Sequence, residues 1–124
     1  VFKTSKGVFV APDPIEEELS KNPIIAQVCV SGLGLPQPIA LVNLANHDLD
    51  ATGLQGTLES HLKEVNRRLS SHEKISNLVI CKDIWSEANL MLTPTLKTRR
   101  VAINDRYGAR FSDWQQSGQS IIWE

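Results

Sequence analysis

The stretch that decides the fold is NPIIAQVCVSGLGLPQPIALVNLA, residues 22–45. Residues 24–32 are rich in β-branched side chains, and residues 39–45 form a second apolar run, so each predicts a buried strand. The glycine- and proline-rich segment between the two runs predicts a turn. We therefore expect the two strands to form a hairpin-like pair.

Two elements are predicted before this pair. Residues 1–12 alternate between apolar and polar side chains around Gly7, which predicts a short N-terminal hairpin with Gly7 in its turn. A helix should follow, with Asp13 as its N-cap and Pro14 at its first helical position. The pair Asn22-Pro23 should end this helix, because a residue before proline avoids the helical conformation.

The rest of the chain predicts one strong helix and several weaker elements. Residues 46–56 should be a loop, and residues 57–75 should be a helix because their leucines and valine recur at helical spacing along one stripe. That stripe comprises Leu58, Leu62, Val65 and Leu69. We further expect a third core strand over 75–83, an irregular segment over 84–98, and a helix over 99–117 with a break at Gly108.

This order of elements predicts an α+β fold: a small mixed or antiparallel sheet with an N-terminal β-hairpin and helices packed on its faces. A length of 124 residues fits a single domain, 1–124. The net charge of −1 argues against general binding of nucleic acid or membrane, so any anion site must be local. Cys29 and Cys81 lie inside apolar runs and lack metal-ligand spacing, so we expect buried free thiols in a reducing cytosol.

Several kinds of catalytic or metal site are disfavoured by the sequence. His47, His61 and His72 have no serine or cysteine on a sharp strand-to-helix turn to act with, and we expect the two later histidines to be solvated helix residues. Asp48 and Asp50 lack the spacing of a calcium loop. No metal site is predicted.

Two basic segments remain as candidates for function. KTSKG, residues 3–7, offers Lys3, Ser5 and Lys6 beside a glycine that lets a backbone approach a ligand closely. LTPTLKTRR, residues 92–100, places one lysine and two arginines where Glu87 is the only acid between Ile84 and Asn104. By residue chemistry alone, the second segment is either a solvated loop or a grip for an anion.

Four segments together resemble the C-terminal domain of adenylate-forming enzymes, in particular the AMP-forming long-chain acyl-CoA synthetases (fatty acid–CoA ligases). They are FKTSKGVFVAPDPIEEEL (2–19), NPIIAQVCVSG (22–32), VNRRLSSHEKI (65–75) and LTPTLKTRR (92–100). Their order and spacing cover nearly the whole chain. Because the chain opens at Val1 directly into the first motif, we expect a large N-terminal adenylation domain to precede it in the parent enzyme.

The resemblance implies a function and roles for individual residues. Such enzymes join a fatty acid to ATP, giving acyl-AMP, and then transfer the acyl group to CoA, with Mg²⁺ as the accompanying ion. The mobile C-terminal domain presents opposite faces to the two half-reactions. Lys97 matches the catalytic lysine of adenylation, and Gly7, with Ser5 and Lys6, matches the hairpin of the pantetheine channel. Lys3, Arg99 and Arg100 would add supporting charge.

The resemblance also implies a setting, and the sequence leaves alternatives open. The isolated domain should be inactive, and the parent should be cytoplasmic, with peripheral contact to a membrane but no membrane span. The wider family has glycine directly before the lysine, where this chain has Leu96, and often a glycine within the segment EANLM, 87–91, which lacks one here. It often has a lysine after the hairpin glycine, where Val8 stands here. An adenylate-forming ligase of another branch and a free-standing anion-binding module are the alternatives.

Overall fold

The structure, a computed structural model, describes residues 1–46 and 48–124. Two strands, β1 (Phe2–Lys3) and β2 (Phe9–Val10), form the expected antiparallel hairpin at the N-terminus. A separate four-stranded sheet has the order β3-β4-β5-β6. Its strands are β3 (Ile25–Ser31), β4 (Ile39–Leu44), β5 (Leu78–Ile80) and β6 (Ile121–Trp123).

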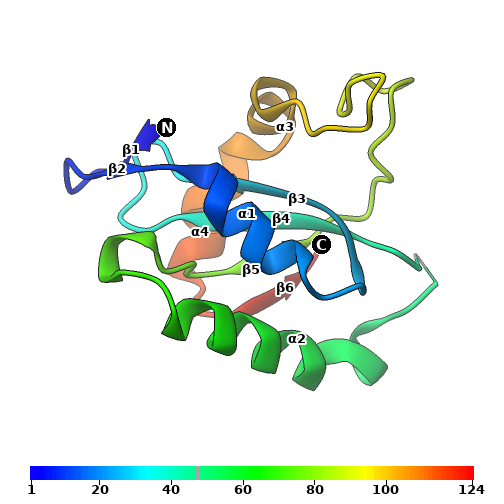
Figure 1. Ribbon diagram of the computed structural model, residues 1–124, viewed down its shortest axis with the longest axis horizontal. Coiled ribbons are helices and arrows are strands. Elements are labelled where there is room, and N and C mark those ends of the chain that lie inside the picture. Colours follow the sequence, from blue (N-terminus) through cyan, green and yellow to red (C-terminus); the bar gives the residue numbers. More distant parts are fainter. Residues whose placement is uncertain (47) are drawn as a thin grey trace.

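The four-stranded sheet is mixed. β3 and β4 pair antiparallel, as the opening stretch predicts, whereas β4–β5 and β5–β6 pair parallel. The helices are α1 (Pro12–Ser20), α2 (Ala51–Arg67), α3 (Arg100–Tyr107) and α4 (Phe111–Gln116). Short 3₁₀ turns lie at η1 (Ser71–Glu73) and η2 (Gly108–Arg110). The α+β expectation is confirmed (Figure 1).

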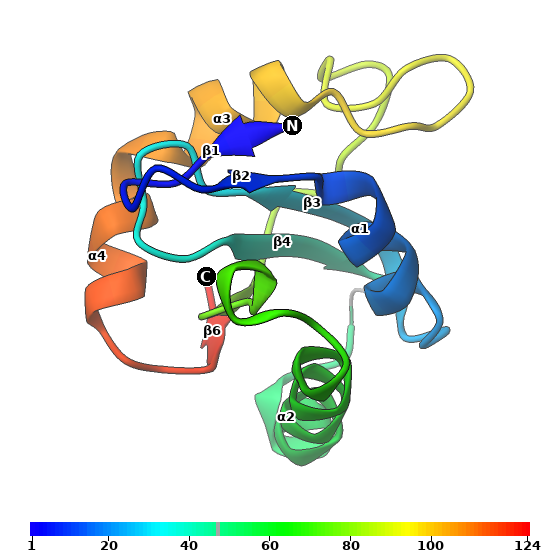
Figure 2. The same cartoon turned by 60° about the vertical axis from the view of Figure 1, so that its left-hand side comes forward.

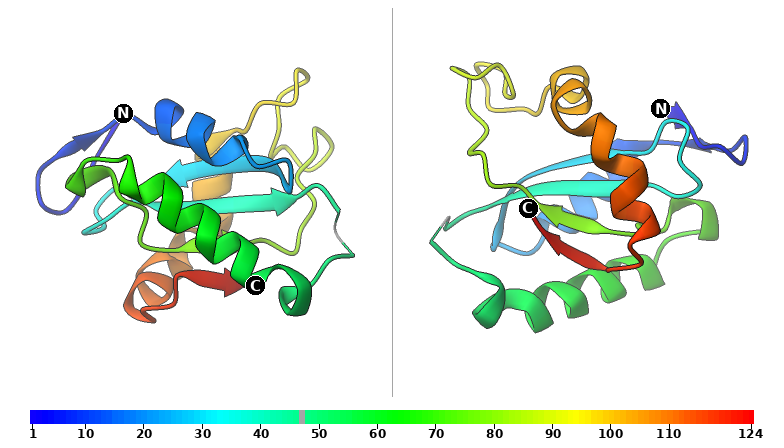
Figure 3. Two further views of the ribbon diagram at one scale, coloured as in Figure 1. Left: turned by 60° about the horizontal axis from the view of Figure 1, so that its bottom comes forward. Right: turned by 180° about the vertical axis from the view of Figure 1, so that it is seen from behind.

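Helices cover both faces of the sheet, and the strands supply a separate core to each. Successive strand side chains point to opposite faces, so Val28 and Val42 pack toward α1 and α2 while Cys29 and Leu41 pack toward α3 and α4. Figure 2 and the two views of Figure 3 show α1 and α2 on one side of the sheet and α3 and α4 on the other. The sheet is therefore the rigid middle layer from which both candidate segments extend.

The helix expected over 57–75 is shifted toward the N-terminus. α2 begins at Ala51 because the carboxylate of Asp50 accepts a hydrogen bond from the Thr52 N–H at 3.1 Å and caps the first turn. The expectation of a loop is therefore wrong for residues 51–56. At the other end, a capping box between Ser70 and Glu73 starts the separate turn η1, so the helix does not continue to residue 75.

Other local expectations are partly corrected. In α1 the N-cap is Ala11 and the first helical residue is Pro12, so Asp13 and Pro14 lie inside the first turn rather than at the cap and first position. Residues 108–110 form a 3₁₀ turn between α3 and α4, which confirms the break at Gly108. β6 was not expected, and it pairs with β5 although the two lie far apart in the chain.

The two cysteines are buried and free, as the sequence predicts. Burial raises the pKa of each thiol, Cys29 and Cys81, to about 12. Both therefore stay protonated at neutral pH. Among the residues that the structure describes, no helix is both long and apolar enough to cross a bilayer.

Candidate functional site

The N-terminal hairpin closes through a tight turn that requires glycine for its backbone conformation. Thr4 N–H donates to Val8 O and Gly7 N–H donates to Thr4 O, each at 3.0 Å. Gly7 has a φ of 82°, in the left-handed region that side chains disfavour. A Cβ built there would meet only Lys3 Cε, at an ordinary 3.9 Å. The backbone conformation, and not lack of space, selects glycine.

The hairpin is fixed to the body by the turn that joins β3 to β4. Ser5 N–H donates to Leu35 O at 2.9 Å, and Gly34 N–H donates to Lys3 O at 3.2 Å. The Lys6 ammonium donates to Gln37 Oε1 at 3.0 Å. The candidate residues Lys3, Ser5, Lys6 and Gly7 therefore gather at one exposed end of the molecule. Exposed apolar side chains stand at the same end: Val8, Phe9 and Leu33.

The segment 84–98, here called the lysine arm, ends in a second tight turn. Leu92 and Thr98 form an isolated antiparallel bridge. Inside it, Thr93 N–H donates to Lys97 O and Leu96 N–H donates to Thr93 O, each at 2.8 Å. Lys97 sits on this closed turn with an exposed side chain. The arm has no helix or regular strand, as expected, but its tip is a hydrogen-bonded turn rather than an extended loop.

Two leucines of the arm adopt left-handed backbone conformations. Leu96 has a φ of 62° and Leu90 a φ of 65°, values that glycine adopts freely and branched residues adopt at a cost. Leu96 is the residue that stands where the wider family has glycine, and Leu90 lies in the segment where a glycine is often found. The backbone at both positions is thus of the kind that favours glycine.

The two arginines next to the arm are engaged within the protein. The Arg99 guanidinium donates to Leu90 O at 3.0 Å, while its backbone N–H donates to Met91 O at 2.8 Å. Arg100 joins three elements: it donates to Val30 O on β3 at 3.2 Å and to Glu16 Oε2 on α1 at 2.7 Å. The same Glu16 oxygen accepts the Val30 N–H at 2.8 Å. Arg100 thus acts as a clamp at the start of α3.

A groove of about 580 Å³ runs between the arm and α1. One wall of the groove is formed by Leu96, Lys97 and Thr98, and another part of the groove is lined by residues 26–28 at the edge of β3. The α1 side carries acidic groups, and these are Asp13, Glu16 and Glu17. Arg100 pairs with Glu16 and, at 3.8 Å, with Asp13. Among the described residues the Lys97 ammonium makes no ion pair of this kind, so it remains available to a ligand.

The structure does not bring the two candidate segments together. The hairpin and the lysine arm project from opposite ends of the domain, as the views in Figures 1, 2 and 3 agree. One ligand cannot contact Gly7 and Lys97 at the same time in this arrangement. Two separate faces therefore exist, each carrying one of the segments predicted to be functional.

The remaining candidates have structural roles or lie outside the described residues. His61 is half-buried, and its Nε2 lies 2.8 Å from Leu19 O at the end of α1, so the expectation of a solvated side chain is wrong for it. His72 lies in η1, and His47 is outside the described residues. Within residues 1–46 and 48–124, no three His, Cys, Asp or Glu side chains gather to hold a metal ion.

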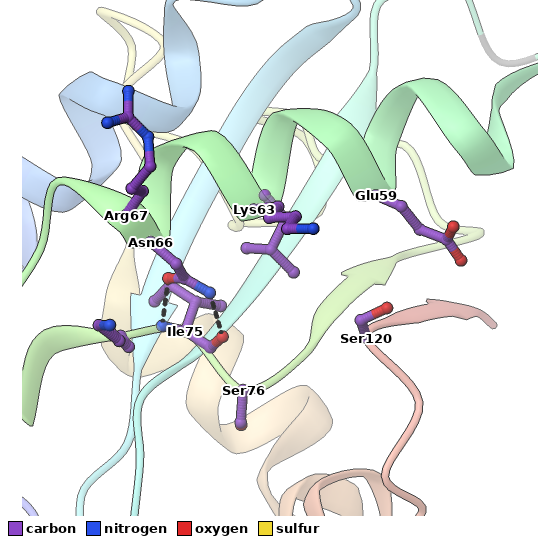
Figure 4. Close-up of a pocket in the computed structure, with 9 residues that line it drawn as sticks. Glu59, Lys63, Asn66, Arg67, Ile75, Ser76 and Ser120 are labelled. Carbon is purple, nitrogen blue, oxygen red and sulfur yellow. Dashed lines mark hydrogen bonds between the residues drawn. The ribbon is translucent and has the colours of Figure 1, made fainter. Parts of the chain in front are cut away.

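A second cavity, of about 640 Å³, lies between α2 and the segment before β5. Figure 4 shows Asn66 reaching from α2 to the backbone of Ile75, where it donates to Ile75 O at 2.9 Å and accepts from Ile75 N–H at 2.8 Å. Both polar atoms of this amide therefore help to attach α2 to the segment before β5. None of the residues predicted to be functional lines this cavity.

Solved structures with the same fold show the class of protein to which this fold belongs. The A-PCP didomain of carboxylic acid reductase from Segniliparus rugosus, in complex with AMP, aligns with a TM-score of 0.76 at 28% identity, covering 91% of this chain and 17% of that chain. An acyl-CoA synthetase from Brucella canis aligns with a TM-score of 0.61 at 24% identity, over 89% of this chain and 19% of that chain, a likeness of fold alone. The fold is that of the C-terminal part of adenylate-forming enzymes.

The family model described as "AMP-binding enzyme C-terminal domain" matches residues 1–114, and the chain belongs to this family. Rat long-chain-fatty-acid–CoA ligase 5 is 28% identical over 127 residues, which cover 83% of this chain and 18% of that protein. The Segniliparus rugosus carboxylic acid reductase is 28% identical over 119 residues, covering 89% of this chain and 10% of that protein. The chain therefore spans less than a fifth of the length of these two relatives.

Sequence reasoning missed two residues that shape the site. Glu16 lies within the first motif without a predicted role of its own, yet it connects Arg100 to β3. Thr93 was named only as part of the motif, yet its backbone and hydroxyl both contact Lys97. The partner of Glu16 is remote in sequence, so no local pattern could have shown it. The spacing of four between Thr93 and Lys97 is a local signal that was available.

Proposed function

We propose that this chain is the mobile C-terminal domain of an AMP-forming long-chain fatty acid–CoA ligase. The observation that carries the proposal is the placement of the hairpin, whose turn contains Gly7, and the lysine arm, whose turn contains Lys97, at opposite ends of the domain. Two half-reactions that need different residues at one active site require such a domain to turn between them. The parent's adenylation domain would hold most of the ATP and fatty-acid contacts.

Lys97 would act in the first half-reaction. Attack of the carboxylate on the α-phosphorus of ATP builds negative charge on the phosphoryl oxygens, and an ammonium placed beside them stabilises that charge. By analogy with loss of one oxyanion donor, the contribution is about 3–4 kcal/mol. An exposed lysine on a closed turn can enter an active site formed by another domain without rearranging its own backbone.

The hairpin would act in the second half-reaction, which forms the thioester with CoA. Gly7 presents a backbone without a side chain, so a narrow pantetheine arm can pass beside it. Ser5 and Lys6 flank this glycine and offer a hydroxyl and an ammonium for polar groups of CoA. Lys3 is a further positive charge at this end, whereas Arg99 and Arg100 directly follow the lysine arm and support its geometry.

The cofactors of the proposed reaction are ATP, CoA and Mg²⁺. Because the described residues offer no cluster for a metal ion, we assign Mg²⁺ to the phosphates of ATP and to the parent's other domain. The chain alone should be inactive, since the fatty-acid pocket would lie elsewhere in the parent. We place the parent in the cytoplasm, with peripheral contact to a membrane as the source of its fatty acid.

The decisive experiment is Lys97→Ala in the full-length parent enzyme, with the two half-reactions measured separately. Formation of acyl-AMP should fall about 10²–10³-fold, while transfer from supplied acyl-AMP to CoA should be largely kept. Lys63→Ala, which removes an exposed lysine of α2, is the matched control and should leave both rates unchanged. Equal losses in both half-reactions for Lys97→Ala would refute the assignment.

A second candidate function is an adenylate-forming enzyme of another branch. The Segniliparus rugosus carboxylic acid reductase favours this alternative, because its identity to the chain equals that of the rat ligase, at 28%. Both candidates share the adenylation step and the role of Lys97. Full-length enzyme incubated with fatty acid, ATP and CoA distinguishes them: release of a CoA thioester supports the ligase, and accumulation of acyl-AMP without thioester supports the other branch.

A further inference from the structure

We propose that Thr93 is the positioning residue of the lysine arm, and that its hydroxyl sets the orientation of Lys97 for adenylation. The proposal rests on the proposed function and adds a specific residue to it. Thr93 lies four residues before Lys97, on the opposite side of the turn.

Thr93 holds both backbone polar groups of Lys97. Its N–H donates to Lys97 O at 2.8 Å, and its Oγ1 accepts the Lys97 N–H at 3.1 Å. Its own carbonyl accepts the Leu96 N–H at 2.8 Å, which closes the turn. One threonine therefore determines the position of the peptide units on both sides of the Lys97 Cα.

The hydroxyl contact is the part of this arrangement that a side chain controls. Leu96 occupies a left-handed conformation at φ 62°, which costs a leucine free energy unless its neighbours hold it there. The two contacts to Thr93 backbone groups exist for any residue at that position. The Oγ1 contact exists only for a hydroxyl residue, so it can be removed without deleting the turn.

Loose positioning would affect adenylation because a lysine must reach the phosphoryl oxygens within hydrogen-bonding distance. A displacement of about 1 Å can lower a rate about 10²-fold. Thr57, an exposed threonine of α2, offers a matched control. Thr95 does not, because its hydroxyl is hydrogen-bonded to Thr93 Oγ1 at 3.1 Å.

The first test measures the turn itself, by amide hydrogen exchange of Lys97 in the 124-residue chain. Thr93→Val keeps the branched shape and removes the hydroxyl, and it should speed Lys97 exchange about fivefold to tenfold, the effect of one hydrogen bond. Thr93→Ser restores the hydroxyl and should restore the protection, and the control Thr57→Val should keep it. If the Lys97 amide exchanges at the same rate in Thr93→Val as in the unaltered chain, the Thr93 hydroxyl does not protect it and the inference fails.

The second test measures function in the full-length parent. Thr93→Val should lower kcat for acyl-AMP formation about 10- to 100-fold, with KM for ATP nearly unchanged and transfer from supplied acyl-AMP to CoA intact. Thr93→Ser should recover most of the rate. If Thr93→Ser is as slow as Thr93→Val, the hydroxyl does not act as a positioning group and the inference fails.

Lys97→Ala separates failure of this inference from failure of the proposed function. If Lys97→Ala abolishes adenylation but Thr93→Val does not slow it, Thr93 has no positioning role and the proposed function stands. If Lys97→Ala leaves adenylation intact, the proposed function falls and the Thr93 inference falls with it.

Discussion

The hairpin and the lysine arm are both closed by a residue in the left-handed conformation, but they reach it in different ways. The hairpin uses Gly7, at φ 82°, for which this backbone is unstrained. The arm uses Leu96, at φ 62°, for which it is strained. The arm compensates with hydrogen bonds to Thr93. The hairpin is held by its own backbone, by the β3–β4 turn, and by the Thr4 hydroxyl, which donates to Val8 O at 3.3 Å.

Under the proposed function, this difference separates two ways of building a turn that meets a ligand. Where a ligand must pass close to the backbone, the smallest residue serves best, and rigidity comes from the β3–β4 turn. Where a charged side chain must be delivered to a point, rigidity of the peptide units around it matters more than access. The four predictions that follow test the two turns, the clamp beside the arm and the body between them.

The largest effect should come from placing a branched side chain in the hairpin turn. In the full-length parent, Gly7→Val should slow thioester formation from supplied acyl-AMP about 10²-fold, because the side chain enters the proposed channel. Acyl-AMP formation should remain near its normal rate.

Gly118→Val is the matched control for this variant. Gly118 has a similar φ of 71° and open space around a built Cβ, but it lies before β6, away from the hairpin. The two variants carry the same backbone strain. Equal thioester rates in the two variants would show that strain, and not position, caused the loss.

The clamp at the base of the lysine arm should have the next largest effect. Arg100→Ala leaves the Glu16 carboxylate, whose side chain is 15% exposed, without its cation. Removing one partner from such a pair should destabilise the domain by about 2–3 kcal/mol, somewhat less than for a fully buried pair. Urea unfolding of the chain measures this change. Arg99→Ala removes an exposed contact and should lower the free energy of unfolding by less than about 1 kcal/mol. A larger loss for Arg99→Ala than for Arg100→Ala would show that Arg99, and not Arg100, is the clamp.

The body that connects the two ends should weaken at alkaline pH. The pKa of each buried thiol is raised to about 12, against about 8.5 in an unfolded chain. The folded state keeps its thiol protons where the unfolded state loses them, so stability is full below about pH 8.5 and falls as pH rises toward 12. Each thiol should contribute a loss of about 1.4 kcal/mol per pH unit in that window.

Urea unfolding of the chain at a series of pH values measures this slope. Cys29→Ala removes one of the two thiols that contribute to this pH dependence. Above pH 8.5, the free energy of unfolding of the variant should therefore fall less steeply than that of the unaltered chain. If the slope is the same with and without Cys29, the thiol is not kept neutral by burial.

The smallest effect should come from Leu96→Gly. Glycine relieves about 1 kcal/mol of left-handed strain but loses about 0.5–1 kcal/mol through its greater freedom when unfolded. Stability should therefore change by less than about 0.5 kcal/mol. Thr95→Gly, one residue earlier and outside the left-handed region, brings the entropic cost and also loses the hydrogen bond to Thr93 Oγ1, so it should destabilise by about 1–2 kcal/mol. Thermal unfolding of the two variants compares them directly.

The sequence predicted the parts of the fold that are encoded locally. The β3–β4 pair follows from alternation and β-branched residues, and Gly7 follows from turn chemistry. The start of α2 was missed because Gly53 and Gly56 lower helix propensity in its first turns, and the Asp50 cap with packing of Leu58 overrides them. β6 was missed because three residues carry no pattern of their own. Its parallel partner β5 defines it as a strand.

For the candidate site, too, the sequence indicated the local features and missed the long-range contacts. Lys97 and the hairpin residues could be named from motifs, but their separation to opposite ends depends on the whole sheet. Arg100 could be named, but its use could not, because Glu16 lies 84 residues away in sequence. Long-range ion pairs of this kind arise from tertiary packing and leave no mark on local periodicity.

The Arg100–Glu16 pair has a consequence beyond stability. β3 is an outer strand of the sheet, and an unprotected outer strand can pair with a strand of another molecule and start aggregation. Glu16 occupies the N–H of Val30 and Arg100 occupies its carbonyl, so a foreign strand finds no hydrogen-bonding partner there. The same two side chains that hold the start of α3 therefore close the Val30 position of this edge to strand pairing.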